Sequence, residues 1–141
     1  MATIIKEFDL QLPLLEVWCA LKDFGNPHLS LAKGFVADTL LNGTIRTITF
    51  ANGQSARERL VAADDTHYRL VYSAFGEGIV HHNASWQLQA RDSVTTHVTW
   101  ITDILPDELR IHIESMMSEA VTAIRATLES ANCRSGGTDL R

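Results

Sequence analysis

The sequence is poor in cysteine and has no long uncharged apolar run. Only two of its 141 residues are cysteines, Cys19 and Cys133, and they provide neither a disulfide framework nor the ligand spacing of a zinc site. The N-terminal segment is interrupted by Lys6, Glu7 and Asp9, and no stretch approaches the roughly 18 apolar residues of a spanning helix. We therefore expect a cytoplasmic protein that has no signal peptide and no stable membrane insertion, with Cys19 buried as a small apolar residue.

Basic residues are also scarce. The chain has 12 Lys and Arg against 17 Asp and Glu, a formal net charge of −5, and its basic residues form no run. Nucleic acids are attracted by a concentrated positive field, so we expect no nucleic-acid partner. Glycine-rich phosphate loops and nucleophile elbows are missing too, and the six histidines lack ligand spacing, so we expect neither a cofactor nor a metal ion.

The hydrophobic pattern indicates one domain over residues 1–131, followed by a polar, disordered tail over 132–141. Apolar residues recur at helical spacing over 14–24 and 107–131, and the segment 28–41 is expected to form a second short helix and a loop or edge strand. Period-two alternation or β-branched composition predicts strands over 3–10, 44–50, 55–62, 68–75, 84–90 and 96–105. This order is typical of an α+β fold in which the long C-terminal helix packs on an antiparallel sheet. A helix across a curved sheet cannot fill the concave face, so we expect a ligand cavity there.

Several motifs carry a resemblance to a known superfamily. They are PLLEVW at 13–18, DFGN at 23–26, GTIRTITF at 43–50, ERLVAADD at 58–65, VYS at 71–73 and VTW at 98–100. In order and spacing they resemble the START-type, birch-pollen-allergen-like helix-grip superfamily (SRPBCC) and, within it, the bacterial polyketide cyclase/dehydrase-like proteins. The ERL and DD residues are also similar to those of plant abscisic-acid receptors.

The resemblance implies a curved, seven-stranded antiparallel sheet that grips the C-terminal helix, with two short helices between the first two strands and an apolar cavity inside. In the hormone receptors the glutamate that matches Glu58 lines the ligand pocket, and a loop that matches residues 76–83 forms a latch over it. The superfamily includes carriers, receptors and aromatase/cyclases, so membership predicts architecture better than chemistry.

Glu58 is the most informative charged residue because it lies between two arginines in a predicted hairpin. If Asn52-Gly53 forms a two-residue turn, Thr47 pairs with Glu58 and both point inward. Arginines 46, 57 and 59 then share the wet face, where their charges need no buried partner. Two interpretations of Glu58 remain: a carboxylate at a strand end that reaches water or bridges to a neighbour, and a carboxylate that lines the cavity. A bulge in the hairpin would reverse the parity.

The same alternation gives the other candidates for ligand contact. Core packing is the alternative for the aromatic residues, and a surface position is the alternative for His82, whose neighbour His81 must face the other way. Glu58, Tyr72 and His82 are also the candidate groups for proton transfer. The full set of candidates for ligand binding is Glu58, Tyr72, Tyr68, Thr47, Trp86, Trp100, His82, Met117 and Val121.

These features support three functional hypotheses. The first is a module that binds one small, mostly apolar or aromatic molecule, such as a lipid-, polyketide- or hormone-like compound, with Glu58 and Tyr72 as polar anchors. The second is a cofactor-free cyclase or dehydratase that uses the same cavity residues for proton transfer. The third is a structural homodimer subunit that associates through its edge strands and has a filled interior.

Overall fold

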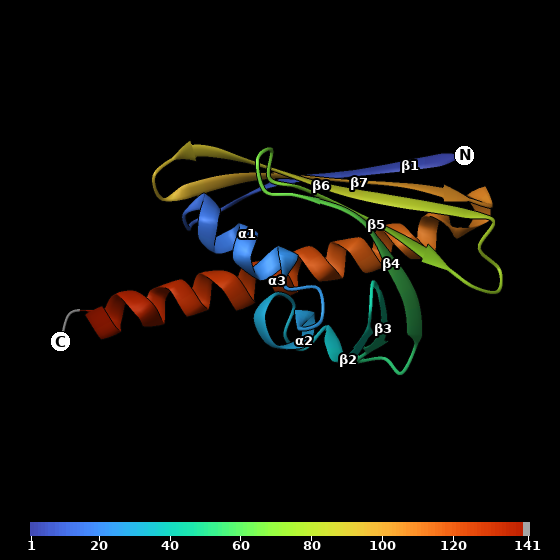
Figure 1. The fold of residues 1–141 in the computed structure, drawn as a ribbon, viewed down its shortest axis with the longest axis horizontal. Helices are drawn as coiled ribbons and strands as arrows, with labels where there is room; N and C mark the ends of the chain where they lie inside the picture. Colours follow the sequence, from blue (N-terminus) through green and yellow to red (C-terminus); the bar gives the residue numbers. More distant parts are fainter. Residues whose placement is uncertain (140–141) are drawn as a thin grey trace.

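The computed structural model describes the backbone of residues 1–139 and the side chains of residues 1–130. Its centre is a seven-stranded antiparallel sheet with the strand order β1-β7-β6-β5-β4-β3-β2 (Figure 1). The strands are β1 (Ala2–Leu10), β2 (Val36–Asn42), β3 (Ile45–Phe50), β4 (Ser55–Asp64), β5 (Arg69–Phe75), β6 (His81–Asp92) and β7 (Thr95–Leu105). Two short helices, α1 (Leu14–Lys22) and α2 (Pro27–Ser30), connect β1 to β2. The predicted α+β helix-grip architecture is therefore confirmed.

The long helix α3 (Arg110–Asp139) follows the short 3-10 helix η1 (Asp107–Leu109) and runs across one face of the sheet (Figure 1). Its inner side buries residues at helical spacing, namely Met117, Ala120, Ile124 and Leu128. The predicted apolar stripe is thus the side that packs on the sheet. The side chains from residue 131 onward, Cys133 included, lie outside the described residues, so the domain boundary at 131 and the disordered tail over 132–141 stay predictions.

Helix α1 fills one end of the concave face. It buries Val17, Trp18 and Leu21 against the sheet. The Trp18 indole N–H donates a hydrogen bond to Asp65 Oδ1 at 2.7 Å, and the Trp18 ring meets the ring of Tyr68 edge-on at 5.9 Å. Cys19 is exposed, so the expectation of a buried thiol was wrong. Because Cys19 directly follows the buried Trp18, its side chain points away from the apolar side of the helix.

The segment 28–41 closes the fold at the opposite edge of the sheet. After α2 it places Leu31, Ala32 and Val36 in the core and continues as β2, the edge strand beside β3. Leu40 and Leu41 remain exposed on this edge. The predicted short helix and edge strand are both present.

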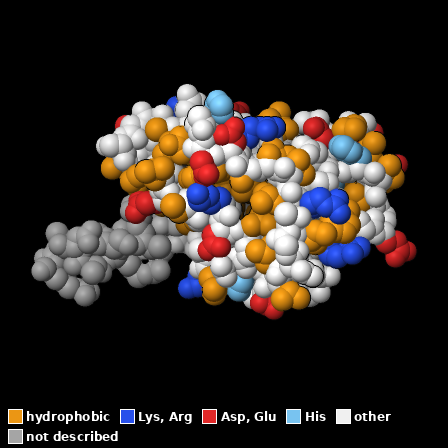
Figure 2. All heavy atoms as spheres, viewed as in Figure 1, with side chains coloured by type: hydrophobic (Ala, Val, Ile, Leu, Met, Phe, Trp, Pro, Cys, Tyr) orange, Lys and Arg blue, Asp and Glu red, His pale blue; other side chains and the backbone are white. Residues whose placement is uncertain are grey.

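The surface mixes charge types. On the face shown in Figure 2, basic side chains are scattered among acidic and apolar ones. Within the described residues, no helix combines the length and the apolar character that crossing a membrane requires.

Candidate ligand-binding site

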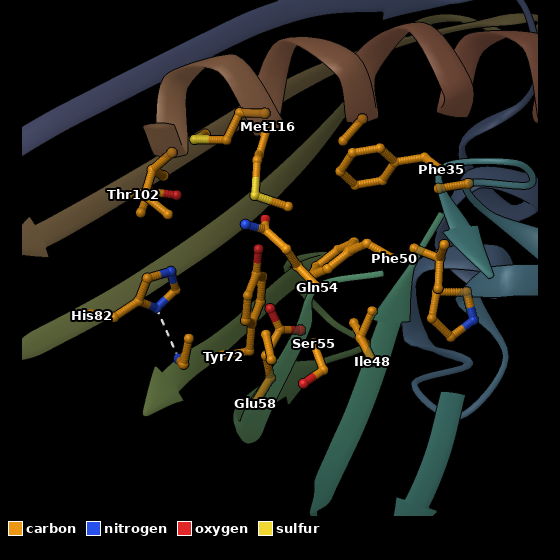
Figure 3. A pocket seen from close by; sticks show the side chains of 18 of the residues that line it. Phe35, Ile48, Phe50, Gln54, Ser55, Glu58, Tyr72, His82, Thr102 and Met116 are labelled. Atoms are coloured by element: carbon orange, nitrogen blue, oxygen red, sulfur yellow. Dashed lines mark hydrogen bonds between the residues drawn. The ribbon is translucent and has the colours of Figure 1, made fainter. Parts of the chain in front are cut away.

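A cavity of about 630 Å³ lies between the sheet and the first half of α3. Its walls come from β3 to β7, from α3, and from the segment that links α2 to β2. Most lining side chains are apolar or aromatic, and a small set of polar groups borders the space (Figure 3). The polar members are Arg46, Gln54, Ser55, Glu58, Tyr72, His82, Trp86, Trp100, Thr102 and His112.

The hairpin between β3 and β4 decides which charged groups reach the cavity. Its loop has three residues, Ala51 to Gly53, because Phe50 pairs with Gln54: the Phe50 N–H donates to the Gln54 carbonyl at 2.8 Å, and the Gly53 N–H donates back to the Phe50 carbonyl at 2.9 Å. Gly53 has a φ of 89°, which the last residue of such a loop requires. The predicted two-residue turn was therefore wrong by one residue.

This one-residue difference reverses the parity of β3 and leaves that of β4 unchanged. Arg46 pairs with Glu58, and Thr47 pairs with Arg57. Glu58 points inward as predicted and is only 8% exposed. Arg46 was expected on the wet face, yet it is equally buried and lines the cavity. Thr47 was expected inside, but it lies on the opposite face and takes no part in the lining.

Arg46 and Glu58 form a buried ion pair. Nε and Nη2 of Arg46 both lie 2.8 Å from Glu58 Oε1, and Nη1 donates to the carbonyl of Phe24 at 3.2 Å. The guanidinium also stacks on the Phe24 ring at 3.8 Å and lies 5.4 Å from the ring of Tyr72. Arg46, which the sequence pattern placed on the solvent-exposed face, thus neutralises the buried charge of Glu58. Both bonds go to Oε1 of Glu58, so Oε2 takes part in neither.

Tyr72 stands beside this pair and directs its hydroxyl toward the middle of the cavity (Figure 3). Burial raises the pKa of Tyr72 above its ordinary value, and the Glu58 carboxylate adds to the effect. Trp100 and Trp86 form the adjacent wall, stacked at 4.1 Å between ring centroids. The Trp100 indole nitrogen is buried without a regular hydrogen-bond partner, although its N–H lowers the pKa of the Tyr72 hydroxyl slightly.

His82 bridges two strands at the point where their ladder ends. The β5–β6 pairing stops at Tyr72 and Ala84, and beyond it the Ala74 N–H donates to Nδ1 of His82 at 2.8 Å (Figure 3). Burial lowers the pKa of His82, against the opposing influence of Glu58. His82 is 8% exposed and lines the cavity, whereas His81 is exposed. The predicted opposite orientation of these two histidines is confirmed.

Two further candidates lie outside the cavity. Tyr68 packs against Trp18 at the end filled by α1, and its φ of 53° takes it out of the regular β5 strand. Val121 packs on the core beside the lining residues Ala120 and Ile124 without lining the cavity itself. Met117 lines the cavity as predicted. Period-two and helical patterns predict which side chains face inward. Which of those side chains line the cavity depends on the other elements that pack over them.

Sequence reasoning missed several lining residues. Arg46 depends on the three-residue loop, which the hairpin signal Asn-Gly does not exclude, because glycine also suits its last position. Gln54 and Ser55 line the cavity where β4 leaves this loop. Gln54 points toward Met116 and Tyr72 (Figure 3). Thr102 and His112 line the cavity from β7 and α3. Thr102 lies on the inward parity of its strand, two residues after Trp100, so alternation was a usable signal for it.

The site offers a few neutral hydrogen-bond donors and acceptors and one ion pair in an apolar setting, which suits recognition of a ligand with few polar atoms. Among residues 1–130, no group of three or more His, Cys, Asp or Glu side chains is arranged to hold a metal ion. The expectation of a site without metal or cofactor stays a prediction.

Comparison with known proteins finds similar structures but no match to the sequence. No protein-family profile matches the sequence, and no curated protein matches it. An uncharacterised protein from Bacillus thuringiensis is similar in structure, with a TM-score of 0.76, 18% identity, and coverage of 90% of this chain and 98% of that chain. A Thermobifida fusca protein has a TM-score of 0.67 and 25% identity, covering 86% of this chain and 85% of its own.

An aromatase/cyclase has the same fold. BexL, the di-domain ARO/CYC of the BE-7585A biosynthetic pathway, matches with a TM-score of 0.74 and 16% identity over 92% of this chain. The match spans 47% of BexL, about the length of one of its two domains. At such identities the likeness shows the fold alone.

Proposed function

We propose that this chain binds one small, mostly apolar molecule in the cavity between the sheet and α3. The observation that carries the proposal is the cavity itself, because about 630 Å³ lies within the range of small-molecule sites. Apolar side chains dominate its walls, and its polar groups cluster near Glu58 and Tyr72. A purely structural subunit would have a filled interior.

The walls favour a flat or flexible apolar ligand of the lipid, polyketide or hormone type. The stacked Trp86 and Trp100 rings offer a broad surface, and Phe35 and Phe50 form a second aromatic pair at 5.2 Å. Methionine side chains adapt to different ligand shapes, and Met116 and Met117 both line the cavity. Membership of the helix-grip superfamily, a cytoplasmic location and homodimerisation belong to the same proposal.

Native mass spectrometry of protein purified from its own host tests the proposal, since a retained molecule adds its mass to the chain. Displacement of a hydrophobic fluorescent dye gives a second readout. Ala56 lines the cavity from β4, so Ala56→Phe should fill part of the space and weaken dye binding, with Ala120→Leu as a second filling variant on α3. Ala63→Phe is the matched control, because Ala63 is exposed on the same strand. Equal dye binding by all four proteins would contradict the proposal.

A cofactor-free cyclase or dehydratase is the second candidate. It is favoured by one observation: Glu58 and Tyr72, a carboxylate and a hydroxyl, border the same cavity. The aromatase/cyclase fold of BexL is consistent with it. Incubation with the copurified molecule, followed by mass analysis for loss of water, tests turnover. Glu58→Gln should abolish that loss while it preserves the fold, and unchanged turnover would remove Glu58 as the base.

A further inference from the structure

The positive charge at the polar end of the cavity is that of Arg46, and it is already paired with groups of the protein. All three nitrogen atoms of the Arg46 guanidinium have acceptors, with two on Glu58 Oε1 and one on the Phe24 carbonyl. The Phe24 ring covers its face at 3.8 Å. Because three of its five N–H groups and one face of the guanidinium are engaged inside the protein, Arg46 is a poorer bidentate partner for a ligand carboxylate or phosphate than a free arginine.

The charge balance at this end is neutral. Arg46 and Glu58 cancel, and burial lowers the pKa of His82, which favours the uncharged imidazole. The second oxygen of Glu58 takes part in neither bond to Arg46, so it would repel an anionic ligand group. An anion placed here would lose its water without gaining a free counterion, and a cation would meet only a carboxylate that is already paired with Arg46.

His82, Trp100 and Tyr72 supply hydrogen-bond donors at this end of the cavity. Nδ1 of His82 accepts the Ala74 N–H, so in the neutral ring the proton must lie on Nε2, the nitrogen turned away from Ala74 (Figure 3). The indole N–H of Trp100, which can only donate, is buried without a regular hydrogen-bond partner. Burial raises the pKa of the Tyr72 hydroxyl, so this group keeps its proton and can donate it to a ligand. Its ring lies 5.8 Å from that of His82, so the two donors are neighbours.

We propose that the cavity selects ligands whose polar group is a neutral acceptor, such as a ketone or amide carbonyl, and rejects carboxylates. The carbonyl oxygen accepts a hydrogen bond from the Tyr72 hydroxyl, beside the Nε2–H of His82. The aromatic walls hold the apolar remainder of the ligand. This inference rests on the proposed ligand-binding function and adds its chemical selectivity.

Four probes with one aromatic frame test this selectivity: 2-acetylnaphthalene, 2-ethylnaphthalene, 2-naphthoate and 2-naphthylmethylammonium. Their dissociation constants at pH 7 are measured by displacement of a hydrophobic dye from the full chain. We expect the ketone to bind about fivefold more tightly than the hydrocarbon, the usual gain from one net hydrogen bond. Both charged probes should bind at least about tenfold more weakly than the ketone, because the site does not replace their hydration.

The chain has two tyrosines, and they form a matched pair of variants. Tyr72→Phe removes the donor and keeps the ring, so the preference for the ketone over the hydrocarbon should fall to about one, while the affinity for 2-ethylnaphthalene stays the same. Tyr68→Phe should leave the preference unchanged, because Tyr68 packs on Trp18 outside the cavity.

The outcomes separate this inference from the proposed function. If 2-ethylnaphthalene binds but 2-naphthoate or the ammonium probe binds as tightly as the ketone, the selectivity proposed here is wrong while ligand binding stands. A ketone preference that survives Tyr72→Phe also overturns it. If no probe binds, both proposals fail.

Discussion

The two ends of the concave face contain similar residues and differ in how their polar atoms are satisfied. At the filled end, Trp18 donates its indole N–H to Asp65, and Tyr68 packs on the Trp18 ring. At the hollow end, Trp100 has a buried indole N–H with no regular partner, and the hydroxyl of Tyr72 points into the cavity. Helix α1 covers the first end, whereas only the first half of α3 spans the second.

The contrast between the two ends indicates where this fold binds a ligand. Buried polar groups in proteins are almost always paired, so a concentration of unpaired donors beside a cavity indicates a site that an external molecule completes. At the filled end, by contrast, the matching indole N–H has a partner inside the protein.

The ion pairs at the two ends give the largest expected contrast. Arg46→Met should destabilise the protein by about 3 to 5 kcal/mol, because it leaves the buried Glu58 carboxylate without a partner. Lys22→Met should change stability little, because the Lys22–Asp65 pair is 43% and 69% exposed. Urea unfolding of both variants measures the difference. The double variant Arg46→Met with Glu58→Leu should regain most of the loss, and a single-variant cost similar to that of Lys22→Met would show that the pair is not buried.

The two adjacent histidines give the next contrast. His82→Leu should cost about 1 to 3 kcal/mol, because the Ala74 N–H loses its acceptor. His82→Asn places an oxygen near the position of Nδ1 and should cost less. His81→Leu changes an exposed residue and should stay within about 0.5 kcal/mol. Equal losses for His81→Leu and His82→Leu would contradict the bridging role of His82.

His82 also predicts a pH dependence. Its pKa in the folded protein is lower than the ordinary value of 6.5, so the unfolded chain binds the proton more readily. The contribution is complete above about pH 6.5 and is lost as the pH falls toward the folded value, at up to about 1.4 kcal/mol per pH unit. Urea midpoints between pH 7.5 and 5.5 measure the slope. His82→Asn should reduce it, whereas His81→Asn should not, and a slope unchanged in His82→Asn would assign the effect to another group.

The two tryptophans give a smaller difference. Trp18→Phe and Trp100→Phe remove the same atoms, but only Trp18 loses a hydrogen bond of regular geometry. Trp18→Phe should therefore cost about 1 kcal/mol more, the net value of one such bond. Thermal or urea unfolding of the two variants tests this, and a larger loss for Trp100→Phe would mean that its N–H is better satisfied than its contacts indicate.

The smallest effect is expected at Thr47, on the outer face of β3. Thr47→Val should change stability by no more than about 0.5 kcal/mol and leave dye binding unchanged. Thr102→Val is the comparison, because Thr102 is buried and lines the cavity. Altered dye binding in Thr47→Val alone would favour the two-residue turn over the observed register.

Sequence patterns predicted most of the architecture but only part of the site. The period-two strands and the apolar stripe of α3 depend on local spacing, and both lie where expected. The inward position of Glu58 was also correct, because the parity of β4 is the same for both loops. The parity of β3 was wrong, because it depends on whether Asn52-Gly53 closes a two- or a three-residue loop, and the local sequence suits both.

The order of the elements, the buried side of the long helix and the inward position of Glu58 follow from the amino-acid sequence, because each depends on periodicity along a single segment. The pairing of Arg46 with Glu58, the tautomer of His82 that Ala74 selects, and the position of Tyr72 at the cavity with Tyr68 outside it follow from the tertiary fold. Each of these depends on which strands and helices meet across the fold, at separations in sequence that no local pattern encodes.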